Sequence, residues 1–378
     1  MLEIQKYLIN STEPTIEAKL EKLKEELGIK SKIYYEDGMV ILNYDQIESP
    51  KSHPIVIECR SLILNIYTLG VVSRKFDRFF NHGECPEFYS DFDINRSYVF
   101  TKEDGSLIGV YYNHFTSKWE ISTRSLAKAE GDHINGGTFR EKVLSAFGFQ
   151  CEEHFQNVMK GYRTSLTYIY EYVGPSNRIV TRYEKDHMVL TAIRDNDSGE
   201  YKSYNMLLAH AEVQQDIGLN VVPVKSYNLS SFDEIKKAID ELPALAEGYV
   251  CFDPVSVKRV KCKSPGYVAI HGLRENGALS MKRAYTLVLI NDHEEYLQYF
   301  PEDKEVFAPV IESVQRFIRT LEVKWEMVSG ITDQKEFALK VKDLHGSGIF
   351  FEAKKKNQHP VHIFNEMDIN KKLRIFDL

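Results

Sequence analysis

The chain has 378 residues, of which 43% are hydrophobic and 27% are charged, as is ordinary for a soluble globular protein. This length allows one large domain and a smaller one. The formal net charge of −7 excludes a uniform attraction to nucleic acid, so a polyanion must bind at a local basic patch.

The cysteines and the N-terminal residues indicate a reduced, intracellular environment. The five cysteines are scattered and form no C-x-x-C pair, which favours free thiols over a disulfide framework. The segment from Met1 to Lys6 lacks a basic region followed by an apolar core, and no apolar run approaches transmembrane length. We therefore expect a cytoplasmic protein with no membrane segment.

The predicted elements of the first 271 residues mix hairpins with separate helices. A helix is predicted over residues 12–28, where apolar residues keep one face and Gly28 offers a left-handed cap. A hairpin is predicted around Asp37-Gly38. Strand-like runs then follow at 55–64, 97–101, 107–113, 165–173, 188–194, 248–252 and 255–263. Helical patterns interrupt them near 139–147, 204–217 and 231–241. This mixture predicts an α+β fold rather than a doubly wound sheet.

The pattern changes toward the C-terminus. Apolar residues follow helical spacing from Val310 to Leu321 and again from Phe337 to Leu344. We therefore predict one domain over residues 1–271 and a second, mostly helical domain over residues 272–378.

Lys102 is the first candidate for chemistry. It begins the segment Lys102-Glu103-Asp104-Gly105-Ser106 between two apolar runs, which predicts a strand–turn–strand hairpin with an amine at its mouth. Such an amine can act as a nucleophile if neighbouring cations or a metal lower its pKa. The competing interpretation is a solvated lysine in a hairpin turn.

Two glutamates on predicted strands are candidates for binding a ribose or a metal. Strand alternation places Glu171 between Ile169 and Val173 on one face, where a carboxylate is unusual. It could hold a ribose hydroxyl or a divalent metal, or it could be a carboxylate at a sheet rim. Glu247 precedes Gly248 at the start of another strand and could orient a metal near a phosphate, or simply mark a turn.

Basic residues recur with strand periodicity. Lys261 and Lys263 share a face with Arg259 beside them, and ammonium groups about 7 Å apart match neighbouring phosphate oxygens. A charged solvent face is the alternative. Arg60, and the cation–aromatic segment 73–81, could clamp phosphates and stack bases. Motifs for a phosphate-binding loop, a dinucleotide fold and a zinc site are absent.

Together these segments resemble the covalent nucleotidyltransferase superfamily of ligases and capping enzymes, and most of all the bacteriophage RNA ligases that repair cleaved tRNA. The run 175–180 is typical of this subgroup rather than of the superfamily. The likeness extends over residues 40–271, and the matching segments are 58–60, 73–74, 78–81, 101–106, 170–180, 247–250 and 260–268.

The resemblance implies an adenylyltransferase domain of antiparallel sheets with flanking helices. It also implies a three-step reaction that uses ATP and Mg²⁺, with Mn²⁺ as a substitute. Lys102 would attack the α-phosphorus of ATP, and the AMP would pass to an RNA 5′-phosphate that a 3′-hydroxyl then attacks. The remaining roles that the resemblance implies are ribose contact by Glu171, metal-dependent transfer by Glu247, α-phosphate binding by Lys261 and Lys263, outer-phosphate binding by Arg60 and Arg78, and nucleotide contact by Tyr44.

The sequence departs from the family pattern at three places. Residue 78 is Arg where the family carries Lys, and Ser61 stands where Gly often follows the arginine of the first segment. The family's C-terminal metal site is an acidic pair, for which Asp292, Glu294 and Glu295 are the candidates.

The resemblance also names a partner, namely RNA with 5′-phosphate and 3′-hydroxyl ends, such as cleaved tRNA, bound by a monomer. A DNA ligase or a guanylyl-transferring capping enzyme is one alternative, against which the run 175–180 argues. An RNA-binding relative without catalysis is another, against which the intact Lys102, Lys261 and Lys263 argue.

Overall fold

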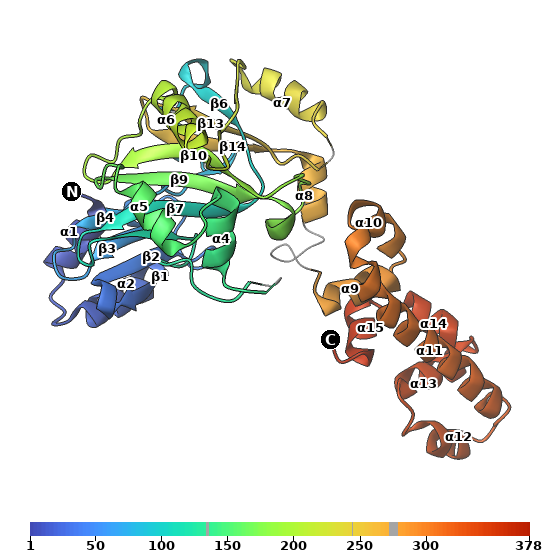
Figure 1. The fold of residues 1–378 in the computed structure, drawn as a ribbon. Helices are drawn as coiled ribbons and strands as arrows, with labels where there is room; N and C mark the ends of the chain where they lie inside the picture. The colour runs from blue at the N-terminus through green and yellow to red at the C-terminus, as the bar shows by residue number, and fades with distance from the viewer. Residues whose placement is uncertain (134–135, 244, 272–278) are drawn as a thin grey trace. The chain divides into compact units, whose positions relative to one another are not determined.

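The structure is a computed structural model that describes residues 1–133, 136–243, 245–271 and 279–378. The chain divides into two compact units, Met1–Ala269 and Ile270–Leu378. Figure 1 follows the elements in chain order. None of the described helices combines the length and the apolarity needed to cross a bilayer.

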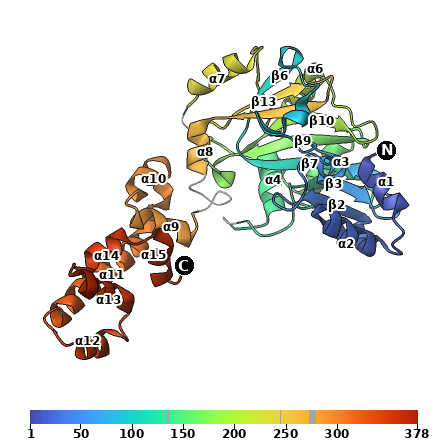
Figure 2. The same cartoon turned by 180° about the vertical axis from the view of Figure 1, so that it is seen from behind.

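The first unit begins with a four-stranded antiparallel sheet in the order β1-β2-β3-β4. Aliphatic side chains between this sheet and its helices form a core, and Figure 2 shows α1 and α2 beside the sheet. The predicted hairpin around Gly38 is confirmed, because Gly38 adopts a φ of +62° between β1 and β2. The elements are α1 (Glu3–Asn10), α2 (Ile16–Leu27), β1 (Ile29–Tyr34), β2 (Met39–Tyr44), α3 (Pro54–Glu58), β3 (Arg60–Asn65) and β4 (Val71–Ser73).

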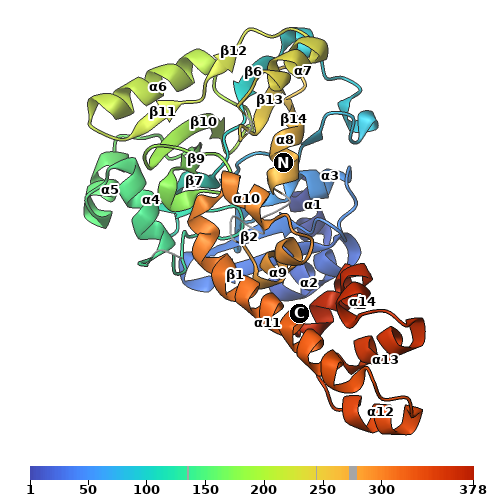
Figure 3. The ribbon, with the colours of Figure 1, turned by 90° about the vertical axis from the view of Figure 1, so that its right-hand side faces the viewer.

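A five-stranded sheet follows, in the order β11-β10-β9-β7-β8. Three helices cover one of its faces (Figure 3) and bury the even-numbered residues of β9, from Leu166 to Tyr172. Glu171 therefore belongs to the opposite face, as the alternation predicts. The elements are β7 (Ser106–Asn113), β8 (Lys118–Ser122), α4 (Phe139–Phe147), α5 (Glu152–Met159), β9 (Leu166–Val173), β10 (His187–Asp195), α6 (Tyr204–Asp216) and β11 (Val221–Pro223).

The other five-stranded sheet has the order β12-β6-β13-β14-β5. Helix α7 covers one face and packs on Val99, Cys251 and Val260. Residues that alternate with these, such as Val250 and Lys261, face the other way. The elements are β5 (Phe80–Asn81), β6 (Tyr98–Thr101), β12 (Ser226–Tyr227), α7 (Phe232–Asp240), β13 (Gly248–Asp253), β14 (Lys258–Lys263) and α8 (Pro265–His271).

The described residues of the second unit form helices and no strand. An apolar cluster from α11, α12, α13 and α14 is its core. The α+β fold and the mostly helical C-terminal region are thus confirmed. The helices are α9 (Met281–Leu289), α10 (His293–Tyr299), α11 (Lys304–Val328), α12 (Gln334–Val341), α13 (Ser347–Lys356), α14 (Pro360–Glu366) and α15 (Ile369–Ile375).

The predicted strand over 55–64 is wrong in its first half. Pro54 starts the short helix α3, where its fixed φ suits the first turn and its missing N–H leaves no bond unmade. Ile55 and Val56 are buried against the first sheet from this helix. A short apolar run gives no period from which to choose between helix and strand. The strand β3 consequently begins at Arg60.

The predicted hairpin at Lys102 is also wrong. Strands β6 and β7 belong to different five-stranded sheets. The Lys102 N–H donates to the Gly248 carbonyl (2.9 Å), which extends the β6–β13 ladder, and the chain then crosses to the other sheet. A β-carbon at Gly105 would lie 2.1 Å from the Tyr172 carbonyl oxygen. The crossing segment therefore touches β9 so closely that only glycine fits.

Ser61 accounts for one departure from the family pattern. It is fully buried at a bulge between β2 and β3 and has a left-handed φ of +59°. Its N–H donates to Asn43 Oδ1 (2.9 Å) and its hydroxyl donates to the Arg124 carbonyl (2.6 Å). The left-handed conformation costs about 1–2 kcal/mol. Two hydrogen bonds of about 1 kcal/mol each offset that cost, so serine can keep the glycine-like backbone.

We expect Gly105→Ala to lower the free energy of unfolding of the first unit by about 1–3 kcal/mol, because the new methyl group must displace the β9 backbone. Urea denaturation followed by Trp119 fluorescence, with Trp325→Phe as the background, reports on this unit alone. Gly161→Ala is the matched control, since the nearest atom to its β-carbon would be 3.9 Å away. Equal stability of the two variants would contradict the steric argument.

Candidate active site

A cavity of ≈ 470 Å³ lies between the two five-stranded sheets of the first unit. Strands β6, β13 and β14 supply one wall, and β7, β9 and β10 supply the other. Five of the predicted site residues line it, namely Tyr44, Arg60, Lys102, Glu171 and Lys261. The fold therefore brings the matching sequence segments together in space, although Tyr44 and Lys261 are 217 positions apart along the chain.

Glu247 joins two of the predicted lysines at one end of this cavity. Its carboxylate lies 2.8 Å from the Lys102 amine and 3.0 Å from the Lys263 amine. The arrangement follows from strand register, because Lys102 adjoins Gly248 across the β6–β13 ladder and Gly248 lies opposite Lys263. Glu247 is only 5% exposed, so the pairing is shielded from water.

The nearest charged partner of the Lys102 amine is the Glu247 carboxylate, and not one of the neighbouring cations expected from the sequence. The side chain is 20% exposed and lines the cavity, so it is not the solvated lysine of the competing interpretation. To act as a nucleophile on a phosphate in the cavity, the amine must turn from Glu247 toward that phosphate.

Lys261 carries the perturbation that was expected at Lys102. Burial and, after it, repulsion from Arg60, Lys102 and Lys263 together lower the pKa of its amine to about 7. Its Nζ lies 4.7 Å from the centre of the Phe79 ring. The amine is therefore about half charged at neutral pH, and a bound anion would restore its full charge.

Glu171 faces the cavity from the middle of a sheet. Strand β9 lies between β7 and β10, so the alternative of a carboxylate at a sheet rim is wrong. Burial raises the pKa of Glu171 to about 8, with Lys102 opposing the rise and Glu247 adding to it. At neutral pH this carboxyl group holds its proton until a cation or a hydrogen-bond donor enters the cavity.

Three arginines surround Tyr44. The guanidinium carbons of Arg78 and Arg124 lie 4.0 and 4.8 Å from the centre of its ring. Burial would raise the pKa of Tyr44, but the positive charges of Arg60, Arg124 and Arg78 outweigh it and lower the pKa. Within the described structure, Arg60 and Arg78 each bury one guanidinium nitrogen without a hydrogen-bond partner. These free donors suit an anion. Arg78 places a planar guanidinium over the Tyr44 ring, and lysine, the residue of the family pattern, has no such group.

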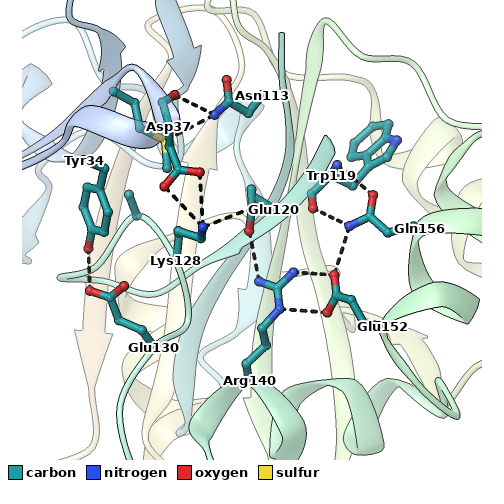
Figure 4. Close-up of polar contacts among 12 residues, drawn as sticks. Tyr34, Asp37, Asn113, Trp119, Glu120, Lys128, Glu130, Arg140, Glu152 and Gln156 are labelled. Atoms are coloured by element: carbon teal, nitrogen blue, oxygen red, sulfur yellow. Dashed lines mark hydrogen bonds and ion pairs between the residues drawn. The ribbon is translucent and has the colours of Figure 1, made fainter. Parts of the chain in front are cut away.

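Arg124 is a cavity residue that the sequence reasoning missed. It lies in the loop between β8 and α4, in a polar stretch without periodicity. Figure 4 shows how this loop is held: Lys128 contacts Asp37 (3.1 Å) and Glu120 (3.8 Å). Glu120 also pairs with Arg140 of α4 (3.1 Å). This chain of ion pairs joins the first sheet, β8 and α4, and it fixes the loop four residues from Arg124.

Asp104 connects three of the matching sequence segments. Its Oδ2 accepts the N–H groups of Val180 (2.8 Å) and Thr181 (2.7 Å), and its Oδ1 accepts the Tyr267 hydroxyl (2.6 Å). The segment 175–180 and the segment after β14 are thus anchored beside Lys102. The sequence reasoning gave Asp104 no role, although its place two residues after Lys102 in the K-x-D-G pattern could have indicated one.

The predicted C-terminal metal ligands belong to the second unit. Asp292 and Glu294 are exposed residues at the start of α10, and the side chain of Glu295 lies outside the described residues. Among the described residues no group of three histidine, cysteine or acidic side chains could hold a metal ion. The assignment of Asp292 and Glu294 to a metal stays a prediction.

Comparison with known proteins gives one family. A family model described as RNA ligase matches residues 58–267. A protein of Autographa californica nuclear polyhedrosis virus, named a bifunctional polynucleotide kinase/RNA ligase, is 31% identical over 349 residues. The match includes 89% of this chain but 47% of that protein. An RNA ligase of a Rhodothermus phage is 23% identical over 357 residues, with 78% of this chain and 80% of that protein matched.

Solved structures resemble the chain more weakly. Naegleria gruberi RNA ligase, solved with ATP and Mn, matches 53% of this chain and 58% of its own with 16% identity and a TM-score of 0.42.

The pKa of Lys261 predicts a pH dependence of ATP binding. Phosphate oxygens need the charged amine, so above pH 7 binding must take up a proton, and affinity should fall by up to about tenfold per pH unit. Lys261→Arg stays charged and should flatten this slope. Calorimetric titration with ATP in metal-free buffer from pH 6 to 9 measures the Kd of both proteins. At each pH the ratio of the two Kd values cancels the effect of the titration of ATP itself. Identical slopes would show that Lys261 does not titrate on binding.

Proposed function

The chain belongs to the RNA ligase family, and from this premise we propose that it is an ATP-dependent RNA ligase whose Lys102 carries AMP. The observation that supports this most is the position of the Lys102 amine. It lies in a cavity with Lys261 and Arg60, and it is ion-paired to a carboxylate that also holds Lys263. A nucleophile and cations for a phosphate are thus in one enclosed space.

The first step forms a bond between Lys102 Nζ and the α-phosphorus of ATP. The bond from that phosphorus to the oxygen shared with the β-phosphate breaks, and pyrophosphate leaves. Glu247, at 2.8 Å, is the carboxylate nearest to the proton that the amine must lose. Lys261 and Arg60 stabilise the negative charge on the phosphate oxygens, since electrostatic stabilisation dominates phosphoryl transfer.

The second and third steps use RNA. An oxygen of the RNA 5′-phosphate attacks the phosphorus of the lysyl-AMP, and the Lys102 amine leaves as the P–N bond breaks. A 3′-hydroxyl then attacks the 5′-phosphorus of the adenylylated RNA, which forms the phosphodiester and releases AMP. The first two steps are displacements at the adenylyl phosphorus and the third is a displacement at the RNA 5′-phosphorus, so cations that bind phosphate oxygens can serve all three.

A divalent cation, Mg²⁺ or Mn²⁺, fits this cavity only in company with phosphates. Glu171 faces the cavity, while both oxygens of Glu247 are engaged by ammonium groups. Magnesium commonly takes one or two carboxylates together with substrate phosphates. We propose that Glu171 would hold such an ion, joined by Glu247 once the amines of Lys102 and Lys263 have turned to the phosphates, and that the bound ion would neutralise charge on the phosphates.

For the RNA we propose ends with a 5′-phosphate and a 3′-hydroxyl, as in a cleaved tRNA. The segment 175–180 supports the tRNA proposal through its resemblance to tRNA-repairing ligases, and Asp104 anchors the end of that segment beside Lys102. We propose a monomer as the active form.

Incubation with α-³²P-labelled ATP and Mg²⁺ should label the protein covalently, whereas labelled GTP should not. Lys102→Ala should abolish labelling at unchanged circular dichroism, because the amine is the attacking atom. Lys118→Ala, which removes an exposed lysine on β8, should label as the wild type does. Full labelling of Lys102→Ala would mean that another residue carries AMP.

The adenylylated protein should seal a single-stranded RNA with 5′-phosphate and 3′-hydroxyl ends, and a tRNA nicked in its anticodon loop, while leaving a nicked DNA duplex open. Removal of divalent cations with EDTA should stop both sealing and adenylylation. Gel electrophoresis of end-labelled strands measures the products. Sealing of the DNA nick in preference to the RNA would instead favour a DNA ligase.

A further inference from the structure

A second hollow, of ≈ 420 Å³, adjoins the candidate active site. The two share Phe100, Thr191 and Arg259 as a common wall. The catalytic roles proposed above leave this hollow without a function. Its remaining lining comes from β6, β10, the segment between β10 and α6, the start of α6, β13 and the turn that joins β13 to β14. It includes Tyr98, Tyr204, Val255 and Val257.

Aromatic rings form a platform in this hollow. Tyr98 and Phe100 share one face of β6, and their ring centroids lie 5.8 Å apart with an angle of 8° between the planes. Tyr204 is tilted against both rings, and its hydroxyl donates to the Val224 carbonyl (2.9 Å), which fixes its position. Tyr98 is 40% exposed. The platform thus runs from the cavity wall at Phe100 to a solvent-accessible ring.

The outer lip of the hollow is apolar as well. Val255 and Val257 lie in the turn between β13 and β14 and are 69% and 39% exposed. Apolar side chains that gather at the rim of a hollow mark a binding surface more often than scattered ones do. Val257 also has a left-handed φ of +59°, which a β-branched residue rarely adopts.

A buried cation stands at the boundary with the active site. Arg259 is 8% exposed, and its guanidinium lies 3.9 Å from the Tyr201 ring centre and 4.0 Å from that of Phe252. Of the described residues, none places a carboxylate within 4.0 Å of it in an ion pair. Its charge is therefore available to an anion. Glu200 is the acidic residue that lines the hollow, while Lys202 is paired with Asp195 (3.5 Å).

We propose that this hollow binds an unpaired nucleobase of the RNA end being joined, stacked on Tyr98, with the adjoining phosphodiester facing Arg259. The inference rests on the proposed function. A surface with a parallel aromatic pair, a cation that has no ion-pair partner within 4.0 Å among the described residues and direct continuity with a phosphate-binding cavity fits single-stranded nucleic acid. An apolar protein segment would leave the charge of Arg259 without a partner, so the charge and the aromatic pair together favour RNA.

The test compares Tyr98→Ala with Tyr98→Phe, which keeps the ring. The probe is a 5′-phosphorylated, single-stranded oligoribonucleotide with a fluorescent label, and its Kd is measured by anisotropy without ATP. Loss of one base–aromatic stack should weaken binding about tenfold in Tyr98→Ala. Tyr98→Phe should bind as the wild type does. Val255→Glu, which adds a negative charge at the lip, should also weaken binding.

Two further measurements keep the inference separate from the proposed function. Covalent labelling with ATP alone should be unchanged in Tyr98→Ala, because Tyr98 does not line the active-site cavity. Tyr67→Ala removes an exposed ring elsewhere in the first unit and should leave RNA binding unchanged. If the wild type did not become covalently labelled with AMP, the ligase proposal would be refuted. The anisotropy assay does not depend on that labelling, so it tests the RNA-binding inference separately.

An oligoribonucleotide with abasic positions identifies the contact. Removing one particular base from the strand should weaken its binding to the wild type as much as Tyr98→Ala weakens binding of the normal strand. The two changes together should raise the Kd no more than either change alone. Equal affinity of Tyr98→Ala and the wild type would overturn the inference. The inference would also be overturned if Tyr98→Ala lost the same affinity for a normal strand as for a fully abasic one. That result would indicate a structural effect or a protein-binding surface.

Discussion

The ion pairs of Glu247 with Lys102 and Lys263 are the contacts on which the candidate site depends. A buried carboxylate without partners would be strongly disfavoured, and so would two partly buried ammonium groups beside each other. One carboxylate between two amines solves both problems. The consequence is that the nucleophile is held in place by Glu247, and phosphates that arrive at Lys263 would compete with Glu247 for the Lys263 amine.

Period-two alternation made much of the site predictable from the sequence. Glu171, Lys261 and Lys263 all lie on strands, where every second side chain faces the same way. Once a strand is recognised, a charged residue among apolar neighbours can be assigned to one face. The same alternation puts the tyrosines of β9 on the other face, where they pack under α4 and α6. Local pattern therefore sufficed wherever a residue's role followed from the face of its own strand.

Contacts between distant segments were beyond that reasoning. Nothing local indicates that β6 and β7 lie in different sheets, because the Asp-Gly sequence that favours a hairpin also allows the close crossing at Gly105. Asp104 acquires its partners from residues 76 and 163 positions away. Arg124 lies in a loop with no periodicity, and Pro54 turned an apolar run into a helix. Pro54 acts locally, through its fixed φ at the first turn, whereas in the other cases a tertiary contact supplied what the local sequence left open.

Burial shifts the pKa values of two groups that face the cavity, Glu171 and Lys261, in opposite directions. It raises the pKa of Glu171 to about 8 and lowers that of Lys261 to about 7, so both lose charge near neutral pH. Such a cavity avoids much of the cost of burying unpaired charges while it is empty. A nucleotide with its cation brings the missing partners for both groups, the phosphates for Lys261 and the cation or ribose hydroxyl for Glu171. Part of the binding free energy then restores the charged forms of Glu171 and Lys261. The protonation of these two residues therefore depends on whether substrate is bound.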